Sequence, residues 1–265
     1  MSHSSYLGAN LTIDLVALKK NYRTLTDKLL PAKLAAVVKA NAYGLGIKEV
    51  ATALSSAGCM IFFVATLDEG IELRQILPNA KIYVFHGVHP GTAEELVANS
   101  LIPVLNSLEQ IENWLPHADH PAALHIDTGM SRLGLTPEEC DKIPFITSYN
   151  IDLVMSHLSC AEDKNHPKNS QQLSLFEKLR KFVPSQYASL AASSGIFLGT
   201  DYHFDLCRAG ICLYGINPTP LSQNPLTQVV RLQAKIIQIR YVDTPQTVGY
   251  GATHRVTKPT KIATL

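Results

Sequence analysis

The sequence lacks paired cysteines of the kind that bind a metal or form disulfides. Its five cysteines, Cys59, Cys140, Cys160, Cys207 and Cys212, contain no Cys-x-x-Cys motif, and their number is odd. This pattern argues against a zinc site and against a complete disulfide framework. We therefore expect reduced thiols, no bound metal and a cytoplasmic protein.

Long apolar runs and an excess of charge of one sign are also missing. The first eight residues contain no charged segment that leads into an apolar one, and no apolar stretch reaches membrane-spanning length. The formal net charge is only +1, so there is no electrostatic argument for binding nucleic acid or an anionic membrane. These absences indicate no signal peptide and no nucleic acid or membrane partner.

The sequence does contain a regular alternation of strand-like and helix-like segments. Ser or Thr followed three residues later by Glu or Gln, the pattern of a capping box, marks four helix starts at Thr66, Thr92, Ser107 and Thr136. Between the helical segments lie short apolar runs typical of buried strands: Leu34–Ala40, Met60–Ala65, Lys81–Phe85, Leu101–Leu105, Ala122–Asp127, Ile151–Met155, Tyr187–Ala192 and Phe204–Ile211.

This alternation predicts the α/β class and, most simply, an eight-stranded parallel (β/α)8 TIM-type barrel. A doubly wound open sheet is the alternative. It would normally bring a Gly-x-Gly-x-x-Gly turn after the first strand if a dinucleotide were bound, and Gly44-Leu45-Gly46 lacks the third glycine.

The character of the sequence changes after the last predicted barrel strand. Residues 218–225 contain three prolines, Val229–Val242 has the pattern of one long strand, and no amphipathic helix follows. We therefore predict a barrel over residues 10–225 and the beginning of a β-rich C-terminal domain over residues 226–265. Since the sequence ends in a strand-like segment, we expect this second domain to be incomplete.

A lysine, Lys39, ends the first apolar run. A buried ammonium group is very unfavourable alone, so this side chain must reach solvent, find a partner, or carry a neutral, reactive amine of the kind that forms Schiff bases. For an isolated lysine, extension to solvent is the commoner outcome. Other polar side chains also follow predicted strands, namely Asp127–Arg132, His157, Ser194 and Arg208. Because barrel enzymes hold their active sites at the carboxyl ends of strands, these residues predict such a site.

The segment around Lys39, Val-Val-Lys-Ala-Asn-Ala-Tyr-Gly-Leu-Gly, closely resembles the pyridoxal-phosphate (PLP) lysine motif of the alanine racemases. These fold-type III enzymes have a β/α barrel followed by a β-rich domain. The resemblance implies that Lys39 carries PLP as a Schiff base and that the Tyr43 hydroxyl contacts the cofactor phosphate.

Asp127–Gly134 is similar to the arginine loop of the same family. By this resemblance, Arg132 contacts the cofactor's phenolic oxygen and the substrate carboxylate, a task suited to a planar fork of donors. One position departs from the family, because His125 stands where many members have a carbamoylated lysine. An imidazole does not replace that negative charge, and either Asp127 or a bound anion such as chloride is expected to compensate.

Two further loops and a histidine complete the expected cofactor site. Ser194, Gly210 and Ile211 follow the last two strands, where barrels often bind phosphate, and hydroxyl and amide donors suit a phosphate dianion. The resemblance assigns phosphate contacts to these three residues and places His157 beside the pyridine ring. The family commonly has Asn where this chain has Ser193.

Arg208 and Tyr250 indicate the type of reaction. An arginine at the ring nitrogen disfavours its protonation, which weakens the electron sink and suits racemisation better than decarboxylation or transamination. Val248–Thr253 resembles the family's catalytic-tyrosine motif, which the neighbouring subunit of a homodimer supplies. Lys39 and Tyr250 are then the two acid–base groups, one on each face of Cα.

The resemblance therefore predicts an alanine racemase, an isomerase that interconverts the small-molecule substrates L- and D-alanine and supplies D-alanine for cell-wall peptidoglycan. Two alternatives remain: a racemase of another amino acid such as serine or lysine, and a non-catalytic PLP-binding barrel. We further expect that a chain with an incomplete second domain binds PLP but racemises alanine slowly.

Overall fold

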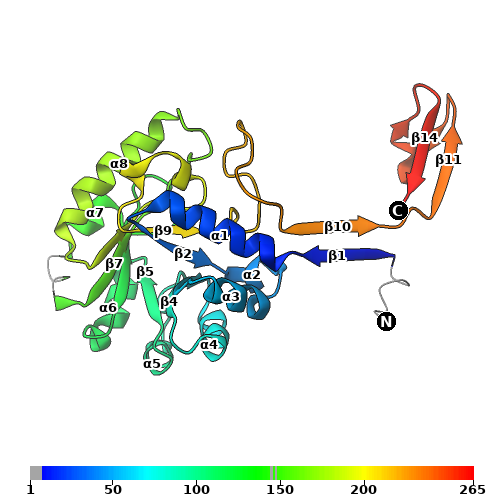
Figure 1. Ribbon diagram of the computed structural model, residues 1–265. Helices are drawn as coiled ribbons and strands as arrows, with labels where there is room; N and C mark the ends of the chain where they lie inside the picture. Colours follow the sequence, from blue (N-terminus) through cyan, green and yellow to red (C-terminus); the bar gives the residue numbers. More distant parts are fainter. Residues whose placement is uncertain (1–7, 144–145, 147) are drawn as a thin grey trace. The chain divides into compact units, whose positions relative to one another are not determined.

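The computed structural model describes residues 8–143, 146 and 148–265 (Figure 1). It divides into two compact units. Asp14–Val229 form the larger one, and the smaller one consists of the described residues up to Ile13 together with Val230–Leu265.

The larger unit contains eight parallel strands in the order β8-β7-β6-β5-β4-β3-β2-β9. The outermost strands, β8 and β9, approach each other as well, since Arg208 N–H donates to Ala191 O at 3.0 Å. The sheet is thus a nearly closed barrel, and the predicted barrel is confirmed. The strands are β2 (Lys33–Val37), β3 (Ile61–Val64), β4 (Lys81–Val84), β5 (Ile102–Leu105), β6 (Ala122–His125), β7 (Ile151–Met155), β8 (Tyr187–Ser189) and β9 (Leu206–Ala209).

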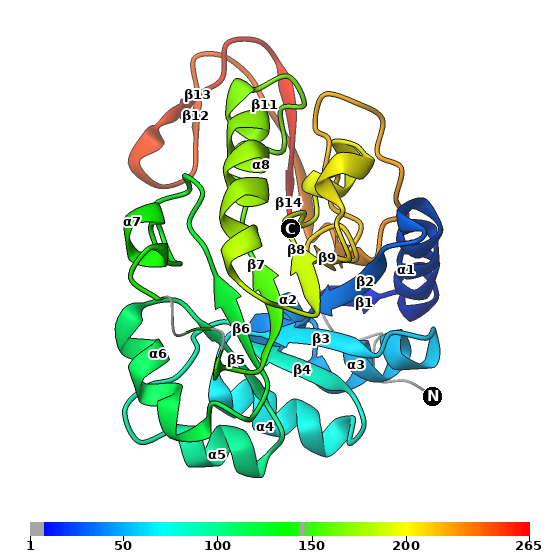
Figure 2. The ribbon, with the colours of Figure 1, turned by 90° about the vertical axis from the view of Figure 1, so that its left-hand side faces the viewer.

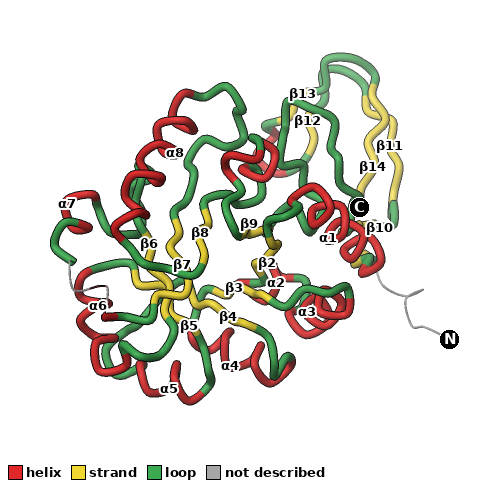
Figure 3. Tube along the Cα trace, turned by 60° about the vertical axis from the view of Figure 1, so that its left-hand side comes forward, coloured by secondary structure: helices red, strands yellow, loops and turns green. Residues whose placement is uncertain are grey.

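Helices surround these strands on the outside (Figures 2 and 3). They are α1 (Leu15–Leu29), α3 (Ile47–Ser56), α4 (Leu67–Ile76), α5 (Ala93–Ala98), α6 (Leu108–Trp114), α7 (Pro137–Cys140) and α8 (Pro167–Leu179), whereas the short α2 (Lys39–Gly44) follows the carboxyl end of β2. Between β8 and β9 the chain forms only the short 3-10 helices η5 (Gly195–Phe197) and η6 (Thr200–Tyr202). No helix in the described ranges is long and apolar enough to cross a membrane.

The predicted helix starts are present, with differences in their caps. Thr66 and Thr136 form reciprocal capping boxes with Glu69 and Glu139. Ser107 Oγ accepts from Gln110 N–H, but the Gln110 carbonyl oxygen accepts from Asn106 instead of closing the box. Thr92 precedes α5 without a side-chain cap.

Apolar side chains fill the barrel interior, which is therefore a packed core below its mouth. Asp152 contacts this core and forms an ion pair with Lys81, whose Nζ is 2.6 Å from Asp152 Oδ1, while the Tyr83 hydroxyl donates to Asp152 Oδ2. The buried cluster consists of Ala35, Val37, Phe63, Tyr83, Ile102, Val104, Ala123, Leu153, Met155 and Leu206.

The smaller unit is made of antiparallel strand pairs, so the β-rich segment is confirmed. β1 (Ala9–Ile13) pairs with β10 (Val230–Ala234), β11 (Gln238–Val242) with β14 (Thr260–Thr264), and β12 (Thr247–Val248) with β13 (His254–Arg255). The prediction of one long strand over Val229–Val242 was wrong. The segment forms two strands, because β10 and β11 have different partners and the chain changes partner between them.

Candidate active site

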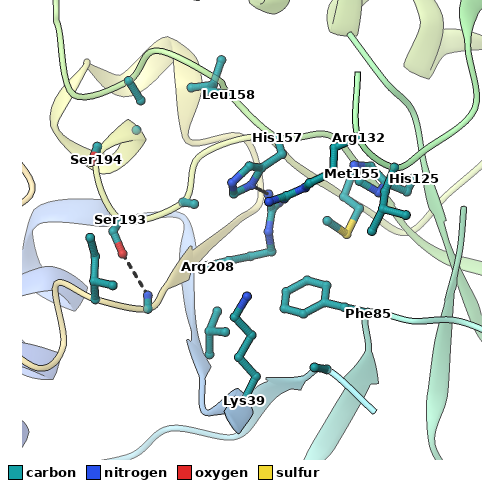
Figure 4. A pocket seen from close by; sticks show the side chains of 18 of the residues that line it. Lys39, Phe85, His125, Arg132, Met155, His157, Leu158, Ser193, Ser194 and Arg208 are labelled. Carbon is teal, nitrogen blue, oxygen red and sulfur yellow. Dashed lines mark hydrogen bonds between the residues drawn. The ribbon is translucent and has the colours of Figure 1, made fainter. Parts of the chain in front are cut away.

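A cavity of about 440 Å³ lies at the carboxyl ends of the barrel strands, a size typical of a small-ligand site. Its lining brings together eight of the nine predicted site residues: Lys39, Tyr43, Arg132, His157, Ser194, Arg208, Gly210 and Ile211 (Figure 4). The ninth, Tyr250, lies in the smaller unit, in the 3-10 turn η7 (Tyr250–Ala252), with a fully exposed side chain.

Lys39 follows β2 and points into this cavity, toward Arg208 (Figure 4). Its Nζ lies 6.0 Å from the centre of the Phe85 ring. The next four residues, Ala40–Tyr43, have φ between 52° and 58°, so α2 is largely a left-handed turn and not a simple glycine-containing one. The sequence did not predict this, because L-residues disfavour the left-handed helix by roughly 1–2 kcal/mol each.

Tyr43, at the end of the left-handed turn, packs its ring against Tyr214 with centroids 5.0 Å apart. The Tyr214 hydroxyl donates to Val37 O at 3.2 Å, which ties the pair to β2. Gly210 leaves room for the Tyr43 hydroxyl, because a Cβ at position 210 would overlap it. The Tyr43 side chain is therefore held against the loop after β9.

Arg208 is the most deeply buried charge of the site. One guanidinium nitrogen donates to Ser189 O and Oγ, and the other donates to Ser156 O at 2.6 Å and His157 Nδ1 at 3.3 Å. Burial lowers the pKa of Arg208 to about 10, so it remains cationic at neutral pH. Because arginine only donates, His157 Nδ1 must accept, and its ring is neutral with the proton on Nε2.

Burial, and next the charge of Arg208, lowers the pKa of His157 well below its usual value. A neutral imidazole beside a fixed cation is consistent with the hydrogen bond that the two residues share. The cavity wall at this point thus carries one positive charge, on Arg208, and a neutral aromatic ring.

Arg132 is exposed at the cavity edge, in a loop that Asp127 shapes. The Asp127 carboxylate accepts from the amides of Gly129, Met130 and Ser131 at 2.8 to 3.2 Å. Within the described part of the chain, Asp127 and Arg132 form no ion pair. Asp127 therefore orders the loop backbone and does not supply the missing negative charge to the Arg132 guanidinium.

His125 has a defined tautomer because of Asn106. The Asn106 amide nitrogen donates to Phe85 O and Val104 O, so its carbonyl oxygen must face His125 Nδ1, 2.8 Å away. His125 Nδ1 is thus the donor, and Nε2 keeps its lone pair. Burial is the main reason, followed by Arg208, that the pKa of His125 falls to about 4.

This lowered pKa predicts how stability depends on pH. Between about pH 6.5 and pH 4 the unfolded imidazole binds a proton that the folded one does not, so the free energy of unfolding should fall as the pH falls. The difference is on the order of 3 kcal/mol for this residue. Urea denaturation between pH 4.5 and 7.5 measures it. His125→Asn should flatten the slope, while the exposed His89→Asn should not; equal slopes in both variants would contradict the prediction.

The phosphate-binding prediction is compatible with the loops after β8 and β9. Ser193, in the loop after β8, accepts through its Oγ from the amides of Gly210 and Cys212, at 3.0 and 3.4 Å. These hydrogen bonds connect this loop to the loop after β9. Among the described residues, the amides of Ser194, Gly195 and Ile211 make no hydrogen bond to protein, although all three residues line the cavity. Gly210 N–H is already used by Ser193, so the remaining amides and the Ser194 hydroxyl are the donors available to an anion.

Gln172, a completely buried residue of α8, was not among the predicted site residues. Its amide nitrogen donates to Thr128 Oγ1 and His157 O, and its carbonyl oxygen accepts from Ser159 N–H at 2.9 Å. It thereby joins the arginine loop to the loop of His157. A signal existed: Gln172 shares its helix face with Phe176 and Leu179, and a polar residue on an apolar face needs internal partners.

Comparison with known protein families settles the relationship of this chain. The family model "Alanine racemase, N-terminal domain" matches residues 13–218, and "Alanine racemase, C-terminal domain" matches residues 229–265. The chain belongs to the alanine racemase family. Members of this family are isomerases.

Individual alanine racemases agree with this assignment. The alanine racemase of Rhodospirillum rubrum is 48% identical, with 100% of this chain and 74% of that protein covered. The catabolic alanine racemase of Mesorhizobium japonicum is 47% identical over 97% of this chain and 70% of that protein.

Solved structures show the same likeness. The alanine racemase of Bartonella henselae with covalently bound pyridoxal phosphate has a TM-score of 0.89 at 39% identity, covering 97% of this chain and 74% of that one. The biosynthetic alanine racemase of Pseudomonas aeruginosa has the same TM-score at 31% identity and the same coverage.

Proposed function

We propose that this chain is a PLP-dependent racemase that interconverts L- and D-alanine by proton transfer at Cα. The observation that carries the proposal is the Lys39 amine, which points into a cavity whose other walls present a buried arginine and unpaired loop amides. A family whose members are named alanine racemases provides independent support.

The residues present fit the cofactor. Lys39 Nζ would hold the PLP aldehyde covalently, His157 would lie beside the ring, and Arg208 would face the ring nitrogen. Tyr43, Ser194 and the Ile211 amide would hold the phosphate, with Gly210 contributing a close backbone approach and, through Ser193, the loop geometry. When bound, PLP supplies an electron-withdrawing ring that makes the substrate Cα–H acidic.

Arg208 favours racemisation over other PLP chemistry. Its guanidinium stays charged and would repel a proton on the ring nitrogen of a bound cofactor, which would weaken the electron sink and suit return of the proton to Cα. The contacts of Arg208 with Ser156, Ser189 and His157 hold the guanidinium in place at the cavity wall.

Two groups would move the proton, and a third would orient the substrate. We assign Lys39 Nζ to one face of Cα and Tyr250 Oη to the other, with the Arg132 guanidinium on the substrate carboxylate. Since the Tyr250 side chain is fully exposed in its own unit, we propose that it serves the cavity of a second subunit in a homodimer.

We also propose a cytoplasmic enzyme that supplies D-alanine for peptidoglycan. All five cysteines are unpaired thiols, as a reducing compartment favours. Relatives carry both biosynthetic and catabolic names, so the physiological direction needs its own test. Growth of a D-alanine auxotroph on expression of the chain would support the biosynthetic role, and absence of growth despite measured activity would contradict it.

The reaction itself is tested with the PLP-loaded chain, L-alanine and deuterated water, followed by chiral chromatography and mass spectrometry. We expect D-alanine that carries solvent deuterium at Cα, above the level with free PLP. L-serine and L-lysine serve as matched substrates. Faster conversion of either would assign the site to a different amino acid. No conversion of any of them by a chain that holds PLP would favour a non-catalytic PLP-binding barrel.

A further inference from the structure

The backbone directly after Lys39 needs external support. Four consecutive residues with positive φ, none of them glycine, form a turn that is unfavourable by several kcal/mol when isolated. Inside the turn, Ala42 N–H donates to Val38 O at 2.9 Å, and Asn41 O accepts from Gly46 N–H at 3.0 Å. The Asn41 side chain also accepts from Ile47 N–H at 2.7 Å, which joins the end of the turn to α3.

The start of the turn is held by a carboxylate from a different helix. Ala40 N–H donates to Glu69 Oε1 at 2.6 Å. The other oxygen, Oε2, accepts from Ala65 N–H at 2.7 Å and from Thr66 N–H at 3.4 Å. One carboxylate therefore joins the carboxyl ends of β2 and β3 at the rim of the cavity.

We propose that Glu69 is a positioning residue for Lys39. The peptide bond is planar, so an anchor on Ala40 N–H also fixes the Lys39 carbonyl and the ψ angle of Lys39. The Cα–Cβ direction of Lys39 relative to the cavity then follows from the positions of Ala65 and the helix α4. The inference rests on the proposed function, in which Lys39 is the residue that carries PLP.

The chemistry of a carboxylate explains why glutamate stands at this position. A helix cap alone needs one acceptor at the third helical residue, and Gln serves as well as Glu there. Glu69 instead accepts with both carboxylate oxygens, Oε1 from Ala40 N–H and Oε2 from Ala65 N–H. A Gln side chain has only one carbonyl oxygen, so its NH₂ group would face the N–H donor of either Ala40 or Ala65 and leave that donor without an acceptor.

The chain contains a matched control in the second reciprocal capping box. Glu139 Oε2 accepts from Thr136 N–H at 2.9 Å and caps the short helix α7. Glu69→Gln and Glu139→Gln are therefore the same change at the same position of a capping box. Only the first removes a contact to the residue after Lys39.

Hydrogen exchange of the PLP-free chain tests the anchor without reference to catalysis. We expect the Ala40 amide to exchange at least tenfold faster in Glu69→Gln than in the wild type or in Glu139→Gln, while the amides of the barrel strands exchange alike in all three chains. Glu69→Asp provides a second variant, because its shorter side chain cannot span Ala40 and Ala65. Unchanged exchange at Ala40 in both Glu69 variants would overturn the anchor.

Reaction of each variant with PLP, trapped by borohydride and quantified at Lys39 by peptide mass spectrometry, tests the consequence. We expect labelling to be slower by about 10- to 100-fold in Glu69→Gln and Glu69→Asp but not in Glu139→Gln, as for other small misplacements of a reacting group. Faster exchange at Ala40 with normal labelling would overturn the positioning role while the proposed function stands. A wild-type chain that is not labelled at all would overturn the proposed function, and the role of Glu69 with it.

Discussion

Lys39→Ala is expected to abolish covalent retention of PLP and to lower alanine racemisation by about 10⁴-fold, the upper range for loss of an acid–base group. The amine is both the point of attachment and one of the two proposed proton carriers, so no other cavity side chain replaces it. Dialysis followed by an absorbance spectrum measures retention, and chiral chromatography measures turnover.

Lys33→Ala is the matched control for Lys39→Ala. Lys33 is the first residue of β2, the strand that Lys39 follows, and its Nζ lies 3.2 Å from the Tyr187 hydroxyl. Its loss should leave PLP retention and turnover at wild-type level. Retention of PLP by Lys39→Ala after dialysis, with activity, would contradict the assignment of Lys39.

Tyr250→Phe is expected to reduce turnover by 10²- to 10⁴-fold, because it removes only the hydroxyl proposed to exchange a proton with Cα. PLP retention should remain normal, which separates this variant from Lys39→Ala. The exposed Tyr241 of the same unit provides the control, and Tyr241→Phe should have wild-type turnover.

Mixed dimers test whether one subunit supplies Tyr250 to the other. If Lys39→Ala and Tyr250→Phe chains are dissociated and re-paired at random, half of the dimers are hybrids with one intact site, and about a quarter of wild-type activity should return. Recovery to this level would support the shared site. No recovery, with hybrid dimers demonstrated by mass spectrometry, would place both acid–base groups in one chain.

The barrel was predictable because each of its parts has a local signal. Strand-like apolar runs and capping residues at Thr66 and Thr136 set the alternation, and helices such as α3 bury one apolar face, made of Ile47, Val50, Ala51 and Leu54. The positions of the site residues at strand ends then follow from parallel pairing. The residues that predict each strand, helix start and site position thus lie in or next to the element concerned.

Features that depend on distant partners were not predictable. The split of Val229–Val242 into β10 and β11 depends on two different partner strands. β10 pairs with β1, which lies more than 200 residues earlier, and β11 pairs with β14, near the end of the chain. The left-handed turn after Lys39 contradicts local preference and needs Glu69 from another helix. The partner of His125 is Asn106, which directly follows the neighbouring strand β5, and no spacing in the sequence indicates this pair.

The central claim is that Lys39 is the residue that binds PLP covalently. Borohydride reduction of the PLP-loaded chain, followed by proteolysis and peptide mass spectrometry, tests it directly. We predict a single major pyridoxyl group, on the Lys39 side chain within the peptide that contains Val38–Gly46. A pyridoxyl group on another lysine, with Lys39 unmodified, would contradict the account.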